Sequence, residues 1–340
     1  FDPKHWQTFA ELGWLSIPFA EDLGGYGGSI IDLAAIMQEL GRALVVEPVV
    51  PNVVMFGGLL EASSAADKAE ILGELIGGSL MGAVALYEQQ SRFDVANVAT
   101  TATADGDVYR LNGTKVCVLA APSSSKLLVL ARTSGEQTER DGLSLFLLDT
   151  QAEGVALQAY PLMDGQQAAD ITFTDATAEL VSELGQGLSL VDAMLMRTHV
   201  ALSAEAVGIM EKLNQTTVAY TKTRKQFGVP ISSFQALQHR MVDTFMAFEQ
   251  AKSLLVGTLC ELTDEASSEH DKAKMVAGLR TLIAKNGKLI GDEAIQMHGG
   301  MGLTDELDVG HYVKRLMMIN LMFGDRAFFQ NQFNQLAYAV

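Results

Sequence analysis

The chain has 340 residues, 48% of them hydrophobic, and a formal net charge of −17 at neutral pH. This length predicts two or three cooperating domains rather than one small core. The acidic balance argues against a nucleic-acid partner and an anionic membrane surface, because both are bound through clustered Lys and Arg. No apolar run approaches the roughly 18 residues that a transmembrane helix needs, and we expect a cytoplasmic protein.

Residues 1–85 are expected to form an N-terminal helical domain. Leu33, Ile36, Met37 and Leu40 recur at the three- and four-residue spacing of one helix face. The high hydrophobic content also predicts surface buried between subunits, so we expect an oligomer.

Residues 86–182 are expected to form a small antiparallel β-domain, either a barrel or a sandwich. A strand over 98–103 leads to a turn at Asp105 and Gly106. The next segment, 108–111, leads to Asn112 and Gly113, a dipeptide that strongly favours a hairpin turn.

Residues 183–340 regain the helical period and predict at least four long helices, arranged as an up-down bundle. Phe234, Leu237, Met241, Phe245 and Phe248 form one such apolar stripe. The complete order, helical domain, β-domain and helix bundle, gives an α+β fold class.

The two cysteines, Cys117 and Cys260, stand in apolar sequence surroundings, which predicts buried, reduced thiols. The six histidines show no paired-ligand spacing, so we expect no metal site.

Two late motifs carry the most chemical information: RKQFGVPISSFQ at 224–235 and QMHGGMG at 296–302. Arg224 offers a fixed cation with a planar fork that suits a pyrophosphate, and Phe227 offers a flat apolar face. Gly299 and Gly300 permit close approach of backbone to a ligand, and Gln296 can hydrogen-bond it. Each residue alone would be read as a helix cap, a core aromatic or a solvated polar group.

Together with the domain order, these motifs resemble the acyl-CoA dehydrogenase family over essentially the whole chain. The resemblance implies FAD as cofactor, an acyl-CoA substrate and an electron-transfer flavoprotein or similar acceptor. It also implies that residues such as Arg224, Phe227, Gln296, Gly299 and Gly300 hold the FAD of a neighbouring subunit. The other subunit then supplies the flavin-ring pocket and the catalytic base.

In this chain, the residues that would form the flavin-ring pocket and the catalytic base depart from the family pattern. Gly324 aligns Phe323 with the usual base, and ungapped counting back from Phe227 places Thr198 at the alternative position. Neither side chain can accept an α-proton at neutral pH. Leu119 replaces a hydroxyl that would hydrogen-bond the flavin ring, and Tyr87 stands where the family commonly has threonine.

Three hypotheses follow. The first is a subunit of a mixed α2β2 tetramer that lacks its own base and completes its homologous partner's FAD site, similar to the heteromeric steroid side-chain enzymes. The second is a self-sufficient dehydrogenase whose base has moved to Asp325, Glu205 or Glu88. The third is a non-enzymatic acyl-CoA- or protein-binding scaffold.

Overall fold

The computed structural model describes residues 1–338 and divides into two compact units. Unit 1 comprises Phe1–Ser29 and Val46–Thr198, and unit 2 comprises Ile30–Val45 and the chain from His199 onward. The expected boundaries at residues 85 and 182 remain a prediction. Helix α5 (Gly187–Thr223) contributes residues to both units.

The helical part of unit 1 is made of short elements. They are α1 (Pro3–Glu11), η1 (Trp14–Ser16), η2 (Glu21–Leu23), η3 (Val50–Gly57, a π-helix), α3 (Gly58–Ala62) and α4 (Lys68–Ile76). Asp2 begins α1 by accepting a hydrogen bond from the N–H of Lys4, as expected of an N-cap aspartate. Phe19, Phe56 and Leu59 are fully buried among these elements.

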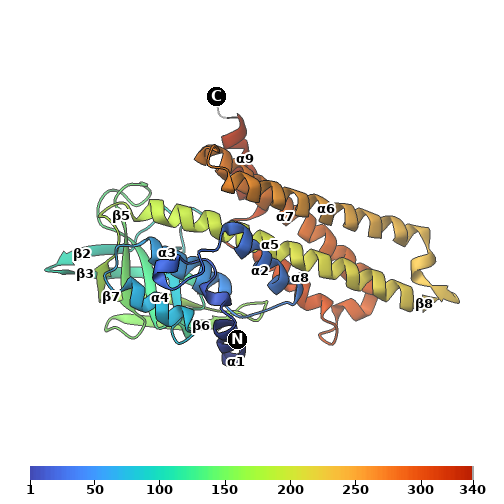
Figure 1. Ribbon diagram of the computed structural model, residues 1–340, viewed down its shortest axis with the longest axis horizontal. Helices are drawn as coiled ribbons and strands as arrows, with labels where there is room; N and C mark the ends of the chain where they lie inside the picture. Colours follow the sequence, from blue (N-terminus) through green and yellow to red (C-terminus); the bar gives the residue numbers. More distant parts are fainter. Residues whose placement is uncertain (339–340) are drawn as a thin grey trace. The chain divides into compact units, whose positions relative to one another are not determined.

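The β-domain of unit 1 is a mostly antiparallel sheet (Figure 1). Its strands are β1 (Gly82–Ala85), β2 (Thr101–Asp105), β3 (Val108–Leu119), β4 (Lys126–Arg132), β5 (Leu143–Asp149), β6 (Val155–Pro161) and β7 (Gln167–Leu180), with η4 (Ala121–Ser123) after β3. The pairings β4–β2–β3–β7–β5–β4 close into a ring, so the sheet has a barrel's connectivity. Leu111, Phe146 and Ile171 belong to its buried core.

Two details of the β-domain differ from expectation. Strand β4 pairs in parallel with β1 and β2, so the sheet is not purely antiparallel. The hairpin turn also lies earlier than Asn112 and Gly113, because Asp105 already pairs with Val108. Gly113 instead pairs with Phe173 inside β3, beside a register shift where β7 carries the extra residue, and a Cβ atom at Gly113 would lie 2.5 Å from the Thr100 hydroxyl.

Unit 2 is a helix bundle with one small hairpin (Figure 1). Besides the end of α5 it contains α2 (Ile30–Arg42), α6 (Gln235–Thr263), α7 (Glu269–His298), α8 (Val309–Leu321) and α9 (Arg326–Tyr338). The short elements are β8 (Lys225–Gln226), β9 (Val229–Pro230), η5 (Ile231–Ser233) and η6 (Gly299–Leu303). The α+β fold with a C-terminal bundle is thus confirmed.

Glycines allow α2 and α5 to approach closely. A Cβ atom at Gly208 would lie 1.9 Å from the carbonyl oxygen of Gln38, and one at Gly41 would lie 2.1 Å from that of Glu205. Arg42 of α2 forms an ion pair with Glu211 of α5, with 2.5 Å between Nη2 and Oε2. These contacts fix α2 on the bundle.

The apolar stripe expected for α6 is only partly core. Phe248 is buried, whereas Phe234 and Phe245 are exposed, because a helix of this length presents more apolar faces than its neighbours in one chain cover. The exposed apolar surface supports the expected oligomer.

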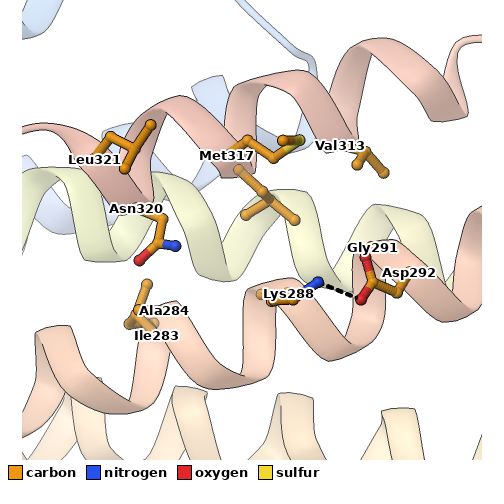
Figure 2. Close-up of a pocket in the computed structure, with 11 residues that line it drawn as sticks. Ile283, Ala284, Lys288, Gly291, Asp292, Val313, Met317, Asn320 and Leu321 are labelled. Atoms are coloured by element: carbon orange, nitrogen blue, oxygen red, sulfur yellow. Dashed lines mark hydrogen bonds and ion pairs between the residues drawn. The ribbon is translucent and has the colours of Figure 1, made fainter. Parts of the chain in front are cut away.

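A groove of about 230 Å³ lies between α7 and α8. Gly287 and Gly291 line it on α7, and Val313 and Met317 line it on α8. Figure 2 shows Asn320 reaching from α8 toward α7 within a mostly apolar lining, which also includes the ion pair of Lys288 and Asp292.

Candidate cofactor-binding site

The first predicted motif forms a tight hairpin after α5. Arg224 directly follows the helix, and its N–H donates to the carbonyl of Tyr220 at 2.9 Å. Its own carbonyl accepts from the N–H of Ile231 at 2.8 Å, across the base of the paired strands β8 and β9. Both hydrogen bonds hold the backbone of Arg224, while its side chain remains exposed to solvent.

Phe227 and Gly228 form the two-residue turn of this hairpin. Both have left-handed backbones, with φ of 54° and 82°. For a phenylalanine this conformation costs roughly 1–2 kcal/mol. The Phe227 ring is 91% exposed, and its ring neighbour is Phe234 at 6.1 Å between centroids. A strained, solvent-exposed aromatic ring at a hairpin tip indicates a binding contact outside this chain.

The second motif forms a bare backbone turn at the end of α7. Gly299 has φ 61° and ψ −140°, a conformation that essentially only glycine adopts. Its N–H donates back to the carbonyls of Gln296 and Ile295. A Cβ atom built on Gly299 or Gly300 would meet nothing within 4 Å. The turn therefore exposes main chain to any ligand that approaches, with the exposed Gln296 one turn upstream.

The structure brings the two motifs to one end of the bundle through a contact that the sequence did not suggest. The ring of Tyr220, one turn before Arg224, lies 4.3 Å from that of His298, the residue before Gly299. The Tyr220 hydroxyl also donates to the His298 carbonyl at 3.4 Å. A tyrosine one helical turn before the arginine and a histidine before the glycine pair were the only sequence signals for this contact.

These groups fit a dinucleotide chemically. A guanidinium fork can bind a pyrophosphate bidentately, and an exposed aromatic ring can stack on a flat heterocycle. A glycine pair with no Cβ atoms lets the ligand reach main-chain groups directly. The open space at Gly299 and Gly300 and the exposure of Phe227 and Arg224 are the features that such a ligand requires.

The two expected base positions carry no acid or base. Thr198 is fully buried, and its hydroxyl donates to the carbonyl of Met194 at 2.9 Å within α5. Phe323 lies in the turn between α8 and α9 with a left-handed φ of 58°. Gly324 follows it, and a Cβ atom there would lie 2.6 Å from the ring of Phe329.

Glu88, one candidate for a relocated base, belongs to a buried ion pair. Its carboxylate lies 2.8 Å from the ammonium of Lys115, and both side chains are almost inaccessible. It also accepts hydrogen bonds from the N–H groups of Ala99 and Thr100. Burial alone would raise the pKa of Glu88, but the Lys115 charge and hydrogen bonds lower it to about 2. Such a carboxylate is a weak base.

The other two candidates are likewise engaged in structure. Glu205 is buried and accepts two hydrogen bonds from Arg315, at 2.5 and 2.8 Å. Asp325 accepts from the N–H of Phe328 at 2.8 Å and so caps the start of α9. Each carboxylate has a structural partner that explains its presence.

Leu119 and Tyr87, the positions expected near a flavin ring, lie in the β-domain close in sequence to Cys117 and Glu88. Cys117 lies at a bulge of β3 with φ 52°, and its N–H donates to Asp170 at 3.0 Å. Leu119 is buried, and burial together with Asp192 and Asp94 raises the pKa of Tyr87. The expectation of buried thiols was wrong, because both Cys117 and Cys260 are exposed and free. Apolar sequence neighbours point to other faces at a bulge or on an amphipathic helix.

Comparison with known protein families accounts for most of the chain. Three family models match in order: the acyl-CoA dehydrogenase N-terminal domain over residues 1–79, the middle domain over 83–176 and the C-terminal domain over 185–334. The chain belongs to the acyl-CoA dehydrogenase family. This family consists of FAD-dependent oxidoreductases.

Among its relatives, acyl-CoA dehydrogenase IpdE2 of Mycobacterium tuberculosis is 30% identical over 316 residues, covering 93% of this chain and 80% of the relative. Subunit CarC of the caffeyl-CoA reductase-Etf complex of Acetobacterium woodii is 29% identical over 309 residues, covering 88% and 80%. The solved structure of a variant of the Tcur3481-Tcur3483 steroid ACAD superposes with a TM-score of 0.88 at 26% identity, covering 100% and 89%.

Within residues 1–338, no group of three His, Cys, Asp or Glu side chains is placed to hold a metal ion. No helix in the same range has both the length and the apolar character needed to cross a bilayer.

Proposed function

We propose that this chain is an acyl-CoA dehydrogenase subunit that lacks its own base and completes the FAD site of a homologous partner. The reaction is the α,β-dehydrogenation of an acyl-CoA thioester in a mixed α2β2 tetramer. One contrast carries the proposal. The residues suited to holding a cofactor are exposed at one end of the bundle, whereas each candidate carboxylate is bound to a structural partner.

Bound FAD supplies a hydride acceptor for the β-hydrogen of the substrate. In the proposed complex, Arg224 binds the pyrophosphate and Phe227 covers an apolar ring surface. Gly299 and Gly300 bring main-chain groups against the cofactor, and Gln296 hydrogen-bonds it. The partner provides the carboxylate that removes the α-proton and the hydrogen bonds that polarise the thioester.

Substrate class and acceptor are also part of the proposal. The similarity to the Tcur3481-Tcur3483 steroid ACAD supports CoA esters of steroid side chains as substrates. The similarity to a subunit of a reductase-Etf complex supports an electron-transfer flavoprotein as the acceptor, in the cytoplasm. Exposed Met317 and Leu321 beside the α7–α8 groove support burial against another subunit.

The test is to produce the chain alone and together with a homologous chain that carries the glutamate, and to measure FAD per chain and turnover. We expect no bound FAD and no turnover for the chain alone. The mixed complex should hold about one FAD per pair of chains.

Full FAD occupancy with turnover by the chain alone would contradict this proposal and favour a relocated base. A mixed complex that purifies colourless, without FAD, would also contradict the proposal and would favour a non-enzymatic binding scaffold.

A further inference from the structure

A buried arginine without an acidic partner lies beneath the α8–α9 turn. Arg280 is in the middle of α7 and is 2% exposed. Its Nη2 donates to the carbonyl oxygens of Ile319 at 2.7 Å and Met322 at 3.0 Å, in the last turn of α8. These hydrogen bonds satisfy Nη2, one of the three guanidinium nitrogens. They also place positive charge at the negative end of the helix, which is favourable.

The comparison with Arg315 shows what Arg280 lacks. Arg315 is as deeply buried, but Glu205 neutralises it through two hydrogen bonds. Within residues 1–338, no carboxylate forms an ion pair with Arg280. Burial lowers its pKa to about 10, so the guanidinium still carries its charge at neutral pH. The partial charge of a helix end offsets only about half a unit charge.

The remaining donors of Arg280 are unused. Its Nε and Nη1 are inaccessible and have no hydrogen-bond partner within the described chain. The Phe329 ring covers the guanidinium, with its centroid 5.0 Å from Cζ. Leaving buried charged donors unsatisfied is among the most unfavourable arrangements in a protein interior.

A second unused nitrogen lies against the same aromatic ring. The His199 ring packs edge-on to Phe329, 4.9 Å between centroids, and its Nδ1 is buried without a partner. Burial and then the charge of Arg280 lower the pKa of His199 well below its usual value. The imidazole is therefore neutral at physiological pH, and Nδ1 can carry a proton to donate.

The α7–α8 groove runs along the same stretch of α7, but Arg280, His199 and Phe329 are not among the residues that line it. The α7–α8 groove begins at Ile283 and Ala284, one helical turn beyond Arg280, and it reaches Asn320. Asn320 directly follows Ile319, whose carbonyl Arg280 binds. Figure 2 shows the Asn320 amide turned toward this part of α7. Its Oδ1 lacks a hydrogen-bond donor, so this oxygen suits water and not the ion.

We infer that Arg280, His199 and Phe329 form a binding site for one small monovalent anion of the size of chloride or formate. The ion supplies the missing countercharge and accepts a hydrogen bond from an unused guanidinium nitrogen. Nε and Nη1 point in different directions, so one ion meets one of them and water takes the other. This site is separate from the exposed FAD-binding residues, and the inference does not depend on the proposed function.

The test compares thermal unfolding of the purified full chain in sodium chloride and in sodium gluconate at equal ionic strength. Equal ionic strength cancels general screening of the −17 charge, and gluconate is too large for the site. We expect chloride to raise Tm by a few degrees in a saturable manner, because it binds the folded state alone. The effect should disappear in Arg280→Met and persist in Arg140→Met, which removes an exposed arginine.

Superimposed chloride and gluconate curves for the unmodified chain would overturn the inference, as would an unchanged chloride effect in Arg280→Met. If that variant does not fold, crystals of the unmodified protein soaked in sodium bromide decide the question. An anomalous peak beside Arg280 supports the site, and its absence at high bromide concentration refutes it.

Discussion

Buried ion pairs determine which carboxylates of this chain are free for chemistry. Glu88 and Glu205 are candidate bases in the sequence, where neither shows a partner. Their partners Lys115 and Arg315 are 27 and 110 residues away, so only the folded chain shows the pairing. Both carboxylates hold the fold together instead of facing a substrate.

The Glu88–Lys115 pair should be costly to break. Lys115→Met leaves a buried carboxylate without its counter-ion, and we expect a loss of about 3–5 kcal/mol in the free energy of unfolding. Lys126→Met is the matched control, because its pair with Asp149 is partly exposed and should contribute at most about 1 kcal/mol. Urea denaturation of both variants measures the difference. Equal losses would contradict the structural role.

The same pair predicts an acid-sensitive fold. The pKa of Glu88 is about 2 in the folded chain, below its ordinary value of 4.5, so the unfolded chain binds more protons between these values. The stabilisation from Glu88 is thus complete above about pH 4.5 and is lost as the pH falls toward 2. In Lys115→Met, burial without the ammonium should raise the pKa of Glu88, and acidification should then stabilise the variant. Urea midpoints at pH 7 and pH 4 check the change of sign.

At the scale of elements, the spacing of apolar residues predicted the helices better than the turn-forming dipeptides predicted the hairpins. The apolar spacing of the last 150 residues correctly indicated long helices, because burial of one face repeats along each helix. The Asn112–Gly113 dipeptide failed as a turn signal, because the strand continues through it and Gly113 allows the close approach of Thr100. The Phe234–Phe248 stripe failed as a core signal, because part of it remains uncovered in one chain.

The close crossing of α2 and α5 gives a prediction about packing. Gly208→Ala places a methyl group within 1.9 Å of the Gln38 carbonyl, so the helices must separate. We expect a loss of about 1–3 kcal/mol in the free energy of unfolding. Gly257→Ala in α6 is the control, because its Cβ would lie an ordinary 3.8 Å from Met275, and helix propensity then predicts a gain of about 0.5–1 kcal/mol. Denaturant midpoints should move in opposite directions, and a shared direction would refute the argument.

At the scale of the whole molecule, the candidate site was predictable by residue type but not by arrangement. The motifs named Arg224, Phe227, Gln296, Gly299 and Gly300. The Tyr220–His298 contact that joins their two segments depends on helix packing across 78 residues. The strained backbone and 91% exposure of Phe227 were also invisible in the sequence. Exposure of these residues is the observation on which we base the proposal that they hold another subunit's cofactor.

The central claim is that only one half of the usual FAD site functions in this chain. It is tested most directly by the FAD content of the mixed complex after altering each half of this chain in turn. Arg224→Ala should weaken FAD binding about 10- to 100-fold, the value of a charged hydrogen-bonding contact. Cys117→Glu places a carboxylate at an exposed position two residues before Leu119, in the half proposed to be inactive, and should leave FAD content unchanged. Loss of FAD in Cys117→Glu, with full retention in Arg224→Ala, would contradict the account.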